Sequence, residues 1–241
     1  MKKYMLRLIA VISLIFASLQ LATAQGTIKP YIAEYELKRS LLRAMLDISL
    51  SFDTESNTYT YQSEGEPKGL AGALTNRKLS DSTRFKLDDG TVIPLQYAIG
   101  NGGKDDSGGL TADFDWQEML VKIVNSEESK EHVLEPGMHS ISTFDFNMRL
   151  ALLNGNTVES SAIIIDKGGP RKYEVQILGE EELKTALGKL KTIKYQSSRE
   201  GSPRATIQWL AADLENLPVR VIQTKDGKTT YTMEIKSYQA Q

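Results

Sequence analysis

The sequence contains no cysteine, and this absence excludes several kinds of chemistry at once. Without cysteine there can be no disulfide, no thiolate nucleophile and no cysteine-ligated zinc site. The folded state must therefore be stabilised by burial of apolar side chains, for which a chain of this length has enough residues.

Histidine is almost absent as well. His132 and His139 lie on either side of Pro136-Gly137 with six residues between them, a spacing that fits no zinc motif. No serine lies in a G-x-S-x-G pattern, no acidic stretch has the spacing of a calcium loop, and no glycine-rich segment resembles a phosphate-binding loop. We interpret both histidines as solvent-accessible loop residues, and we expect no catalytic residue, no metal and no cofactor.

Basic residues are scarce once the N-terminal segment is set aside. Lys2, Lys3 and Arg7 lie in the first 24 residues, so 26 of the 29 basic residues remain against 31 acidic ones, a net charge of −5. Surfaces whose main partner is nucleic acid or anionic lipid carry clustered positive charge. We therefore expect no nucleic-acid partner and no anionic-lipid surface as the main partner, while local basic patches remain compatible with the composition.

Residues 1–24 have the features of a cleaved signal peptide. The basic start is followed by an apolar run over Leu8–Leu21 and by Ala22-Thr23-Ala24, which matches an A-x-A cleavage site. Polar residues interrupt the run before the roughly 18 apolar residues that a retained membrane helix needs. We expect export to the periplasm with cleavage after Ala24, no transmembrane anchor afterwards, and a single domain over residues 25–241.

Most of the remaining chain alternates between apolar and polar residues, which is the pattern of half-buried antiparallel strands. In the first such segment Tyr31, Ala33 and Tyr35 share one face and Glu34 and Glu36 the other. Strands are expected at residues 31–38, 44–52, 58–63, 80–87, 93–100, 110–116, 119–125, 130–134, 161–166, 172–178, 190–198, 205–210, 217–224 and 229–238.

One segment has helical spacing instead. Ser140 or Ser142 can cap its start, Phe144 and Met148 lie four residues apart on one face, and Asn154-Gly155 is a typical end. Strands do not alternate with helices, so a parallel sheet is not expected. The predicted fold class is all-β and mainly antiparallel: a large curved sheet, or a partly closed barrel or spiral, of about a dozen strands with one short helix.

A curved sheet beside a helix can leave an apolar groove, and such concavities are the default ligand sites of proteins. The large apolar residues that could line this groove are Leu70, Leu74, Trp116, Phe144, Met148 and Trp209. The alternative interpretation is that these side chains fill the core completely.

Asp113 and Asp115 lie on either side of Phe114 and so share one face of a strand. Paired carboxylates of this kind can hydrolyse glycosidic bonds. They can equally form a polar outer face opposite Phe114 and Trp116, and this is the interpretation that we favour.

Arg220 lies in the segment 206–222, which we interpret as the hairpin that closes the fold. It alternates with valines and so can point into the curve of the sheet, where Asp213 or Glu234 could pair with it. Contact with an anionic ligand is the alternative, and we favour the ion pair.

Several short motifs, taken in chain order, resemble domain-of-unknown-function family 3108 over residues 31–236. They are Asp113-Phe114-Asp115-Trp116, Pro136-Gly137 before a helix that contains Arg149, Gly179-Glu180-Glu181, Leu187-Gly188-Lys189-Leu190-Lys191-Thr192, Trp209-Leu210-Ala211-Ala212-Asp213 and Leu217-Pro218-Val219-Arg220. The resemblance implies an exported bacterial domain without an established activity. It also implies, by analogy of architecture, a likeness to the wide curved-sheet periplasmic proteins that carry lipoproteins or sense envelope stress.

The chain departs from that family's pattern in two places. It has Ser140 where the family tends to have an acidic residue at the start of the helix, and it lacks the family's glycine near Arg43.

We therefore expect an exported, non-catalytic binding module whose apolar groove holds a lipid, a lipoprotein or another hydrophobic small molecule. An alternative is a structural or interaction domain whose partner is another envelope protein. A hydrolase of envelope polymers, acting through Asp113 or Asp115, is a third reading of the same sequence.

Overall fold

The computed structural model describes residues 26–68, 79–100, 109–166 and 168–241. In these residues fifteen strands form one sheet, and α2 (Ile141–Leu153) is the single α-helix. The strands are β1 (Tyr31–Arg39), β2 (Leu42–Asp53), β3 (Thr58–Lys68), β4 (Leu79–Asp88), β5 (Thr91–Gly100), β6 (Leu110–Asp115), β7 (Leu120–Asn125), β8 (Ser129–Val133), β9 (Met138–His139), β10 (Ser161–Asp166), β11 (Gly169–Thr185), β12 (Gly188–Arg199), β13 (Arg204–Ala211), β14 (Leu217–Lys225) and β15 (Lys228–Ala240).

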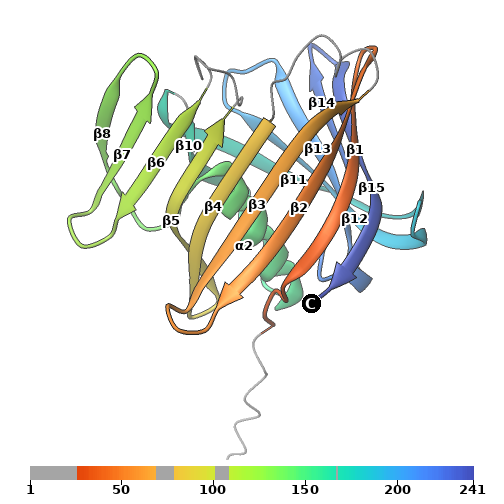
Figure 1. Cartoon of the computed structure of the whole chain (residues 1–241), viewed down its shortest axis with the longest axis horizontal. Coiled ribbons are helices and arrows are strands. Elements are labelled where there is room, and N and C mark those ends of the chain that lie inside the picture. The colour runs from red at the N-terminus through yellow and green to blue at the C-terminus, as the bar shows by residue number, and fades with distance from the viewer. Residues whose placement is uncertain (1–25, 69–78, 101–108, 167) are drawn as a thin grey trace, which may run out of the picture.

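Strands that follow one another in the chain are neighbours in the sheet. The sheet runs from β8 back to β1, crosses to β15, and runs from β15 back to β9, so β8 and β9 are its edges. Figure 1 shows the first and last strands side by side, with Tyr31 opposite Ala240. Every pairing is antiparallel except that of β9 with β10, which confirms the predicted mainly antiparallel class.

The interpretation of residues 206–222 as the closing hairpin is wrong. They form β13, a 3-10 turn over Ala212–Leu214, and β14, which lie well inside the sheet. The pairing of β1 with β15 joins the N-terminal and C-terminal halves instead. Such a contact between distant segments depends on long-range pairing and is not encoded in a local pattern.

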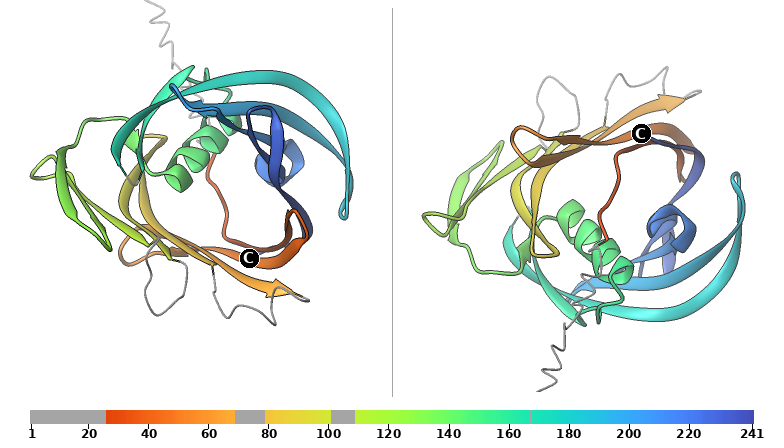
Figure 2. Two further views of the ribbon diagram at one scale, coloured as in Figure 1. Left: turned by 90° about the horizontal axis from the view of Figure 1, so that it is seen from above. Right: turned by 90° about the horizontal axis from the view of Figure 1, so that it is seen from below.

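The sheet curls around α2, as the views from above and below show (Figure 2). A strongly twisted sheet of many strands tends to curl in this way. Strands β8 and β11 approach each other, but no hydrogen-bonded ladder closes the sheet among the described residues. At this approach Nε2 of His132 lies 2.7 Å from where a Cβ on Gly169 would be, so a glycine is required there.

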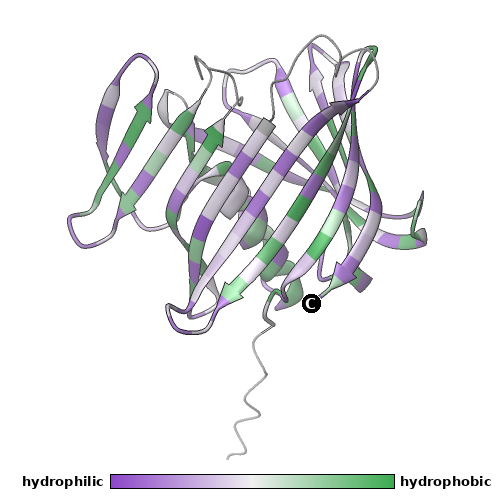
Figure 3. Ribbon diagram, in the orientation of Figure 1, coloured by the Kyte–Doolittle hydropathy of each residue, from purple (hydrophilic) through white to green (hydrophobic). Residues whose placement is uncertain are grey.

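Hydrophobic and hydrophilic residues alternate along the strands, as the bands in Figure 3 show. In β1 the predicted alternation is present, since Tyr31, Ala33 and Tyr35 are buried while Ile32 and Glu34 are exposed. The inward side chains pack on both sides of the helix. Phe146 and Leu150 contact the cluster of β1 and β2, and other helix residues pack against β10, β12 and β13.

The longest hairpin extends beyond the two strands expected for it. Strands were expected at residues 172–178 and 190–198, whereas β11 and β12 are longer and pair up to Thr185 opposite Gly188. The ladder contains a bulge beside Gly179, whose φ is +119°. Almost all of this part of β11 is exposed on both faces. Because exposure does not alternate along this segment, the sequence shows no period-two pattern there, which conceals the extension of the strand from a search for alternation.

Candidate functional site

A cavity of about 280 Å³ lies between α2 and the inner face of the curved sheet. Apolar side chains form part of its wall, among them Ile48, Phe144, Leu217, Val221 and Met233. Tyrosines and amides form the rest, together with two ionisable side chains of the helix, Asp145 and Arg149. The cavity therefore differs from the expected apolar groove in having a strongly polar region.

The helix holds these two residues in place from its first turn. Ser140 accepts a hydrogen bond from the backbone of Thr143 at 3.2 Å, and Thr143 Oγ1 accepts one in return from the Ser140 amide at 2.8 Å. This reciprocal capping box satisfies two amide groups and confirms Ser140 as the N-cap. Residues four apart share one side of a helix, so Asp145 and Arg149 both reach the cavity.

Asp145 is a half-buried carboxyl group with fixed partners. Its Oδ1 accepts hydrogen bonds from Tyr195 Oη at 2.8 Å and from Gln208 Nε2 at 2.9 Å. Burial raises the pKa of Asp145 to about 6, and the two hydrogen bonds and the charge of Arg149 oppose that rise. The side chain can therefore change its charge near neutral pH.

Arg149 is 3% exposed, which is rare for an arginine. Its Nε donates to the carbonyl of Glu215 at 3.2 Å and its Nη1 to Tyr31 Oη at 3.4 Å. The guanidinium also lies over the rings of Tyr31 and Phe146, 5.4 and 5.2 Å from their centroids. A guanidinium has five N–H groups, and those two bonds use two of them, so donors remain for a group inside the cavity.

A second half-buried carboxyl group lies next to the first turn of the helix. Asp81 of β4 accepts hydrogen bonds from Ser142 Oγ at 3.1 Å and from Thr83 Oγ1 at 3.3 Å. Burial is the main reason that its pKa is raised to about 6, and the charge of Asp145 adds to the rise. The interior thus holds two carboxyl groups and one guanidinium.

The model for the family "Protein of unknown function (DUF3108)" matches residues 34–236 of the chain. The chain belongs to the DUF3108 family. This confirms the resemblance seen in the sequence motifs. A search of curated proteins finds no significant match.

A solved structure has a fold similar to that of this DUF3108 chain. A β-barrel-like protein of the DUF1849 family from Brucella abortus has a TM-score of 0.60, with 9% identity over 89% of this chain and 98% of that one. MucB, in its complex with MucA from Pseudomonas aeruginosa, has a TM-score of 0.40 and 9% identity, covering 88% of this chain and 51% of that one. At 9% identity, the similarity to the DUF1849 protein is a similarity of fold.

The groove candidates of this DUF3108 chain are dispersed in the structure. Leu70 and Leu74 lie outside the described residues. Phe144 lines the cavity, and Met148 packs with it in a cluster beside β10. Trp116 packs near β5 and donates its indole hydrogen bond to the carbonyl of Pro94 at 2.7 Å.

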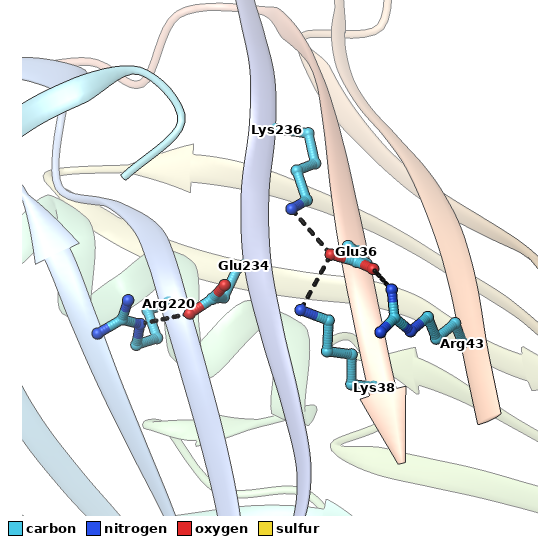
Figure 4. Close-up of polar contacts among 6 residues, drawn as sticks. All are labelled: Glu36, Lys38, Arg43, Arg220, Glu234 and Lys236. Carbon is cyan, nitrogen blue, oxygen red and sulfur yellow. Dashed lines mark hydrogen bonds and ion pairs between the residues drawn. The ribbon is translucent and has the colours of Figure 1, made fainter. Parts of the chain in front are cut away.

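Trp209 lies away from the cavity. Its indole N–H donates to Glu181, and its ring lies under the cations of Lys194 and Arg220 at 4.7 and 5.8 Å. Beside it, Arg220 Nε contacts Glu234 Oε1 at 2.9 Å (Figure 4). The two side chains are 28% and 37% exposed, so the pair is at the surface and not inside the curve as expected. Asp213 is exposed in the 3-10 turn.

Asp113 and Asp115 are exposed on β6. Asp113 accepts a hydrogen bond from Gln96 at 2.8 Å, and Asp115 accepts two from the backbone of the following turn, at Gln117 and Glu118. The structure places both on the outer face, opposite the buried Phe114.

The interpretation of His139 as a solvent-accessible residue is wrong. It lies in β9, is 4% exposed, and contacts the ring of Phe144. Burial lowers its pKa to about 4. Sequence reasoning did not foresee β9 because a parallel pairing of two residues has no recognisable pattern. No cluster of three or more metal-ligating side chains occurs among the residues that the structure describes.

Asp145 and Arg149 were missed because a charged residue on a helix is ordinarily solvated. One signal could have revealed them. The helix also contains Ile141, Phe146, Leu150 and Leu153, which lie on several sides of it. A helix with apolar residues on all sides is buried, so its charged residues must then face an interior space.

Proposed function

We propose that this DUF3108 protein is an exported, non-catalytic binding module that holds a small amphipathic molecule in the cavity beside α2. The ligand has an apolar body and an anionic head group. The observation that carries the proposal is Arg149, a buried guanidinium at the wall of the cavity with donors that the described residues leave unused.

The size and walls of the cavity support a small ligand. About 280 Å³ is the volume of about nine water molecules at roughly 30 Å³ each, and is close to the lower end of ligand pockets, roughly 300 Å³. Phe144, Val221 and Met233 provide apolar surface for a short chain. A whole phospholipid would need more space, so the expected lipid groove is replaced by a site for a smaller amphiphile.

The polar groups support an acid as the head group. Carboxylates and phosphates match the planar donor geometry of a guanidinium. In the described structure Arg149 makes no ion pair with a carboxylate, and Asp145 directs one oxygen to Tyr195 and Gln208. An anion beside Arg149 would provide the hydrogen-bond acceptors and the counter-charge that this buried cation needs.

Export to the periplasm is supported by the signal-peptide features of residues 1–24. The described residues contain no helix long and apolar enough to cross a membrane. Fractionation of cells that express the full chain should recover it in the periplasm with Gln25 as its first residue. Recovery of an uncleaved chain in the cytoplasm would contradict this part of the proposal.

Binding can be tested with three probes of equal chain length: octanoate, octanol and octylamine. Calorimetric titration of the purified protein should show the tightest binding for octanoate and weaker binding for octanol. Octylamine tests the opposite polarity, because the carboxyl group of Asp145 also lines the cavity: tighter binding of octylamine than of octanoate would assign the head group to Asp145 and not to Arg149. Equal binding of octanoate and octanol would overturn the assignment of the head group. If none of the three probes binds, the cavity is not a site for small amphiphiles.

Arg149→Gln should remove the preference for octanoate while octanol still binds, which shows that the cavity survives. Arg220→Gln is the matched control, because it removes a cation from the outer face and should leave octanoate binding unchanged. Loss of preference in both variants would indicate a general effect of charge and not a site at Arg149.

A further inference from the structure

The turn between β1 and β2 exposes two leucines to solvent. Arg39 pairs with Leu42, so Ser40 and Leu41 form a two-residue turn, with Ser40 at a φ of +55°. Leu41 is 96% exposed, the highest value among the large hydrophobic residues that the structure describes, and Leu42 is 53% exposed. Such turns favour glycine, asparagine and aspartate, so a leucine at the apex contributes nothing to the fold.

Basic residues surround these leucines. Lys38, Arg39 and Arg43 lie within six residues, and no acidic residue occurs between Leu37 and Met45. In the sheet Arg43 is opposite Lys38 on one side and Lys68 on the other. The end of the hairpin is therefore strongly basic although the chain without residues 1–24 is acidic overall.

Figure 4 shows that one carboxylate is shared among several of these cations. Lys38, Arg43 and Lys236 all contact Glu36, at 3.2, 3.4 and 2.8 Å. Residues 38–43 themselves contain three basic side chains and no acidic one. The tip therefore carries positive charge beside the exposed leucines.

We propose that the tip of this hairpin, residues 38–43, is a membrane-surface anchor that binds bilayers containing anionic lipids. Leu41 and Leu42 enter the boundary between head groups and acyl chains, and Lys38, Arg39 and Arg43 contact the phosphates. Apolar side chains flanked by cations are the combination that binds such an interface. The turn between β1 and β2 lies at the upper end of the sheet in Figure 1, and the N-terminal segment enters the sheet at the opposite end.

The size of the tip favours a bilayer over a protein partner. A stable protein interface covers roughly 800 Å² on each side, whereas here two leucines project from a narrow two-residue turn. A bilayer accepts a projection of this shape. Because the rest of the protein is acidic, an anionic surface attracts only the tip, and the binding should be reversible and weakened by salt.

Flotation with vesicles tests this proposal independently of the cavity. The purified chain should bind vesicles of phosphatidylcholine with phosphatidylglycerol at low salt and should not bind phosphatidylcholine alone. The double variant Leu41→Ser/Leu42→Ser should lower the partition coefficient roughly tenfold or more. The double variant Arg39→Glu/Arg43→Glu should abolish binding.

Two further exposed residues provide the control. Val133 is 66% exposed and Leu178 is 42% exposed, and neither lies in the tip. Val133→Ser/Leu178→Ser should bind vesicles as the unmodified chain does, and all variants should unfold at the same temperature. Absence of binding by the unmodified chain, or equal loss in the tip and control variants, would overturn the proposal.

Discussion

Tyr195 of β12 donates a hydrogen bond of 2.8 Å to Asp145 of α2, fifty residues earlier in the chain. The bond joins the helix to the inner face of the sheet, and Gln208 of the neighbouring strand donates to the same carboxylate oxygen. A charged group is thereby held in the interior, where its ionisation depends on pH. Several measurable consequences arise from this and related contacts.

Asp145→Asn should make the protein more stable at about pH 8 by up to about 3 kcal/mol, the free-energy equivalent of a shift of roughly two pKa units. The folded-state pKa of about 6 is above the usual value of 3.8, so the folded state holds an extra proton between these values. The stability contributed by the carboxyl is present below about pH 4 and is lost as the pH rises through 6. Urea unfolding across this pH range should show that the free energies of unfolding of Asp145→Asn and of the unmodified chain converge at low pH. Asp113→Asn, which removes an exposed carboxyl group, is the control for a change of charge at the surface.

His139→Leu should show the opposite dependence on pH. The folded-state pKa of about 4 is below the usual 6.5, so the unfolded state binds more protons between these values and stability rises with pH across them. The variant has no imidazole and so does not lose stability in this way at low pH. It should be more stable than the unmodified chain at about pH 4.5, with a smaller difference in stability at pH 8. An equal difference in the free energy of unfolding between the two proteins at both pH values would contradict the burial of a neutral imidazole at His139.

Arg149→Met should destabilise the protein by about 3 kcal/mol, because it removes the bonds to Glu215 and Tyr31 and leaves Asp145 without its nearest cation. Arg220→Met should cost less than about 1 kcal/mol, since its ion pair with Glu234 is partly exposed. Thermal unfolding of both variants at neutral pH checks the ranking. A larger loss of stability in Arg220→Met than in Arg149→Met would show that the ion pair of Arg220 with Glu234 stabilises the fold more than the contacts of Arg149 do.

Gly169→Ala should destabilise the protein by about 2–3 kcal/mol, through the strain of a φ of +99° and a clash with His132. Gly227→Ala is the matched control, because its φ is +73° and nothing lies within 4 Å of a Cβ there, so only strain of about 1 kcal/mol is expected. His132→Ala should rescue the first variant and not the second in a double-mutant cycle. Additive effects would show that the two strands do not press together at this point.

Local sequence patterns predicted burial and capping correctly where these depend on residues close by in the sequence. The alternation of β1 predicted which of its residues are buried, and Ser140 was among the two N-caps expected for the helix. The pattern failed where exposure on both faces removed the alternation, as in β11, and where only two residues pair, as in β9.

Which residues line the candidate site is decided by contacts between segments that are distant in the sequence. Phe144 was expected beside a cavity and lines it. Trp209 was expected there as well, but it is buried in the main core cluster, with its indole N–H toward Glu181, and does not line the cavity. Asp145 and Arg149 were not singled out as site residues, because nothing in a single helix indicates that strands will surround it.

By itself the amino-acid sequence determined the mainly antiparallel strands, the capped helix and the membership of the DUF3108 family, because alternation, capping and family motifs all act over a few residues. Only the tertiary structure decided that β1 pairs with β15, that the sheet curls around α2, and that Asp145 and Arg149 face a cavity. These features depend on contacts between residues up to about two hundred positions apart. Their free energy comes from burying many side chains together, and no short segment contains that information.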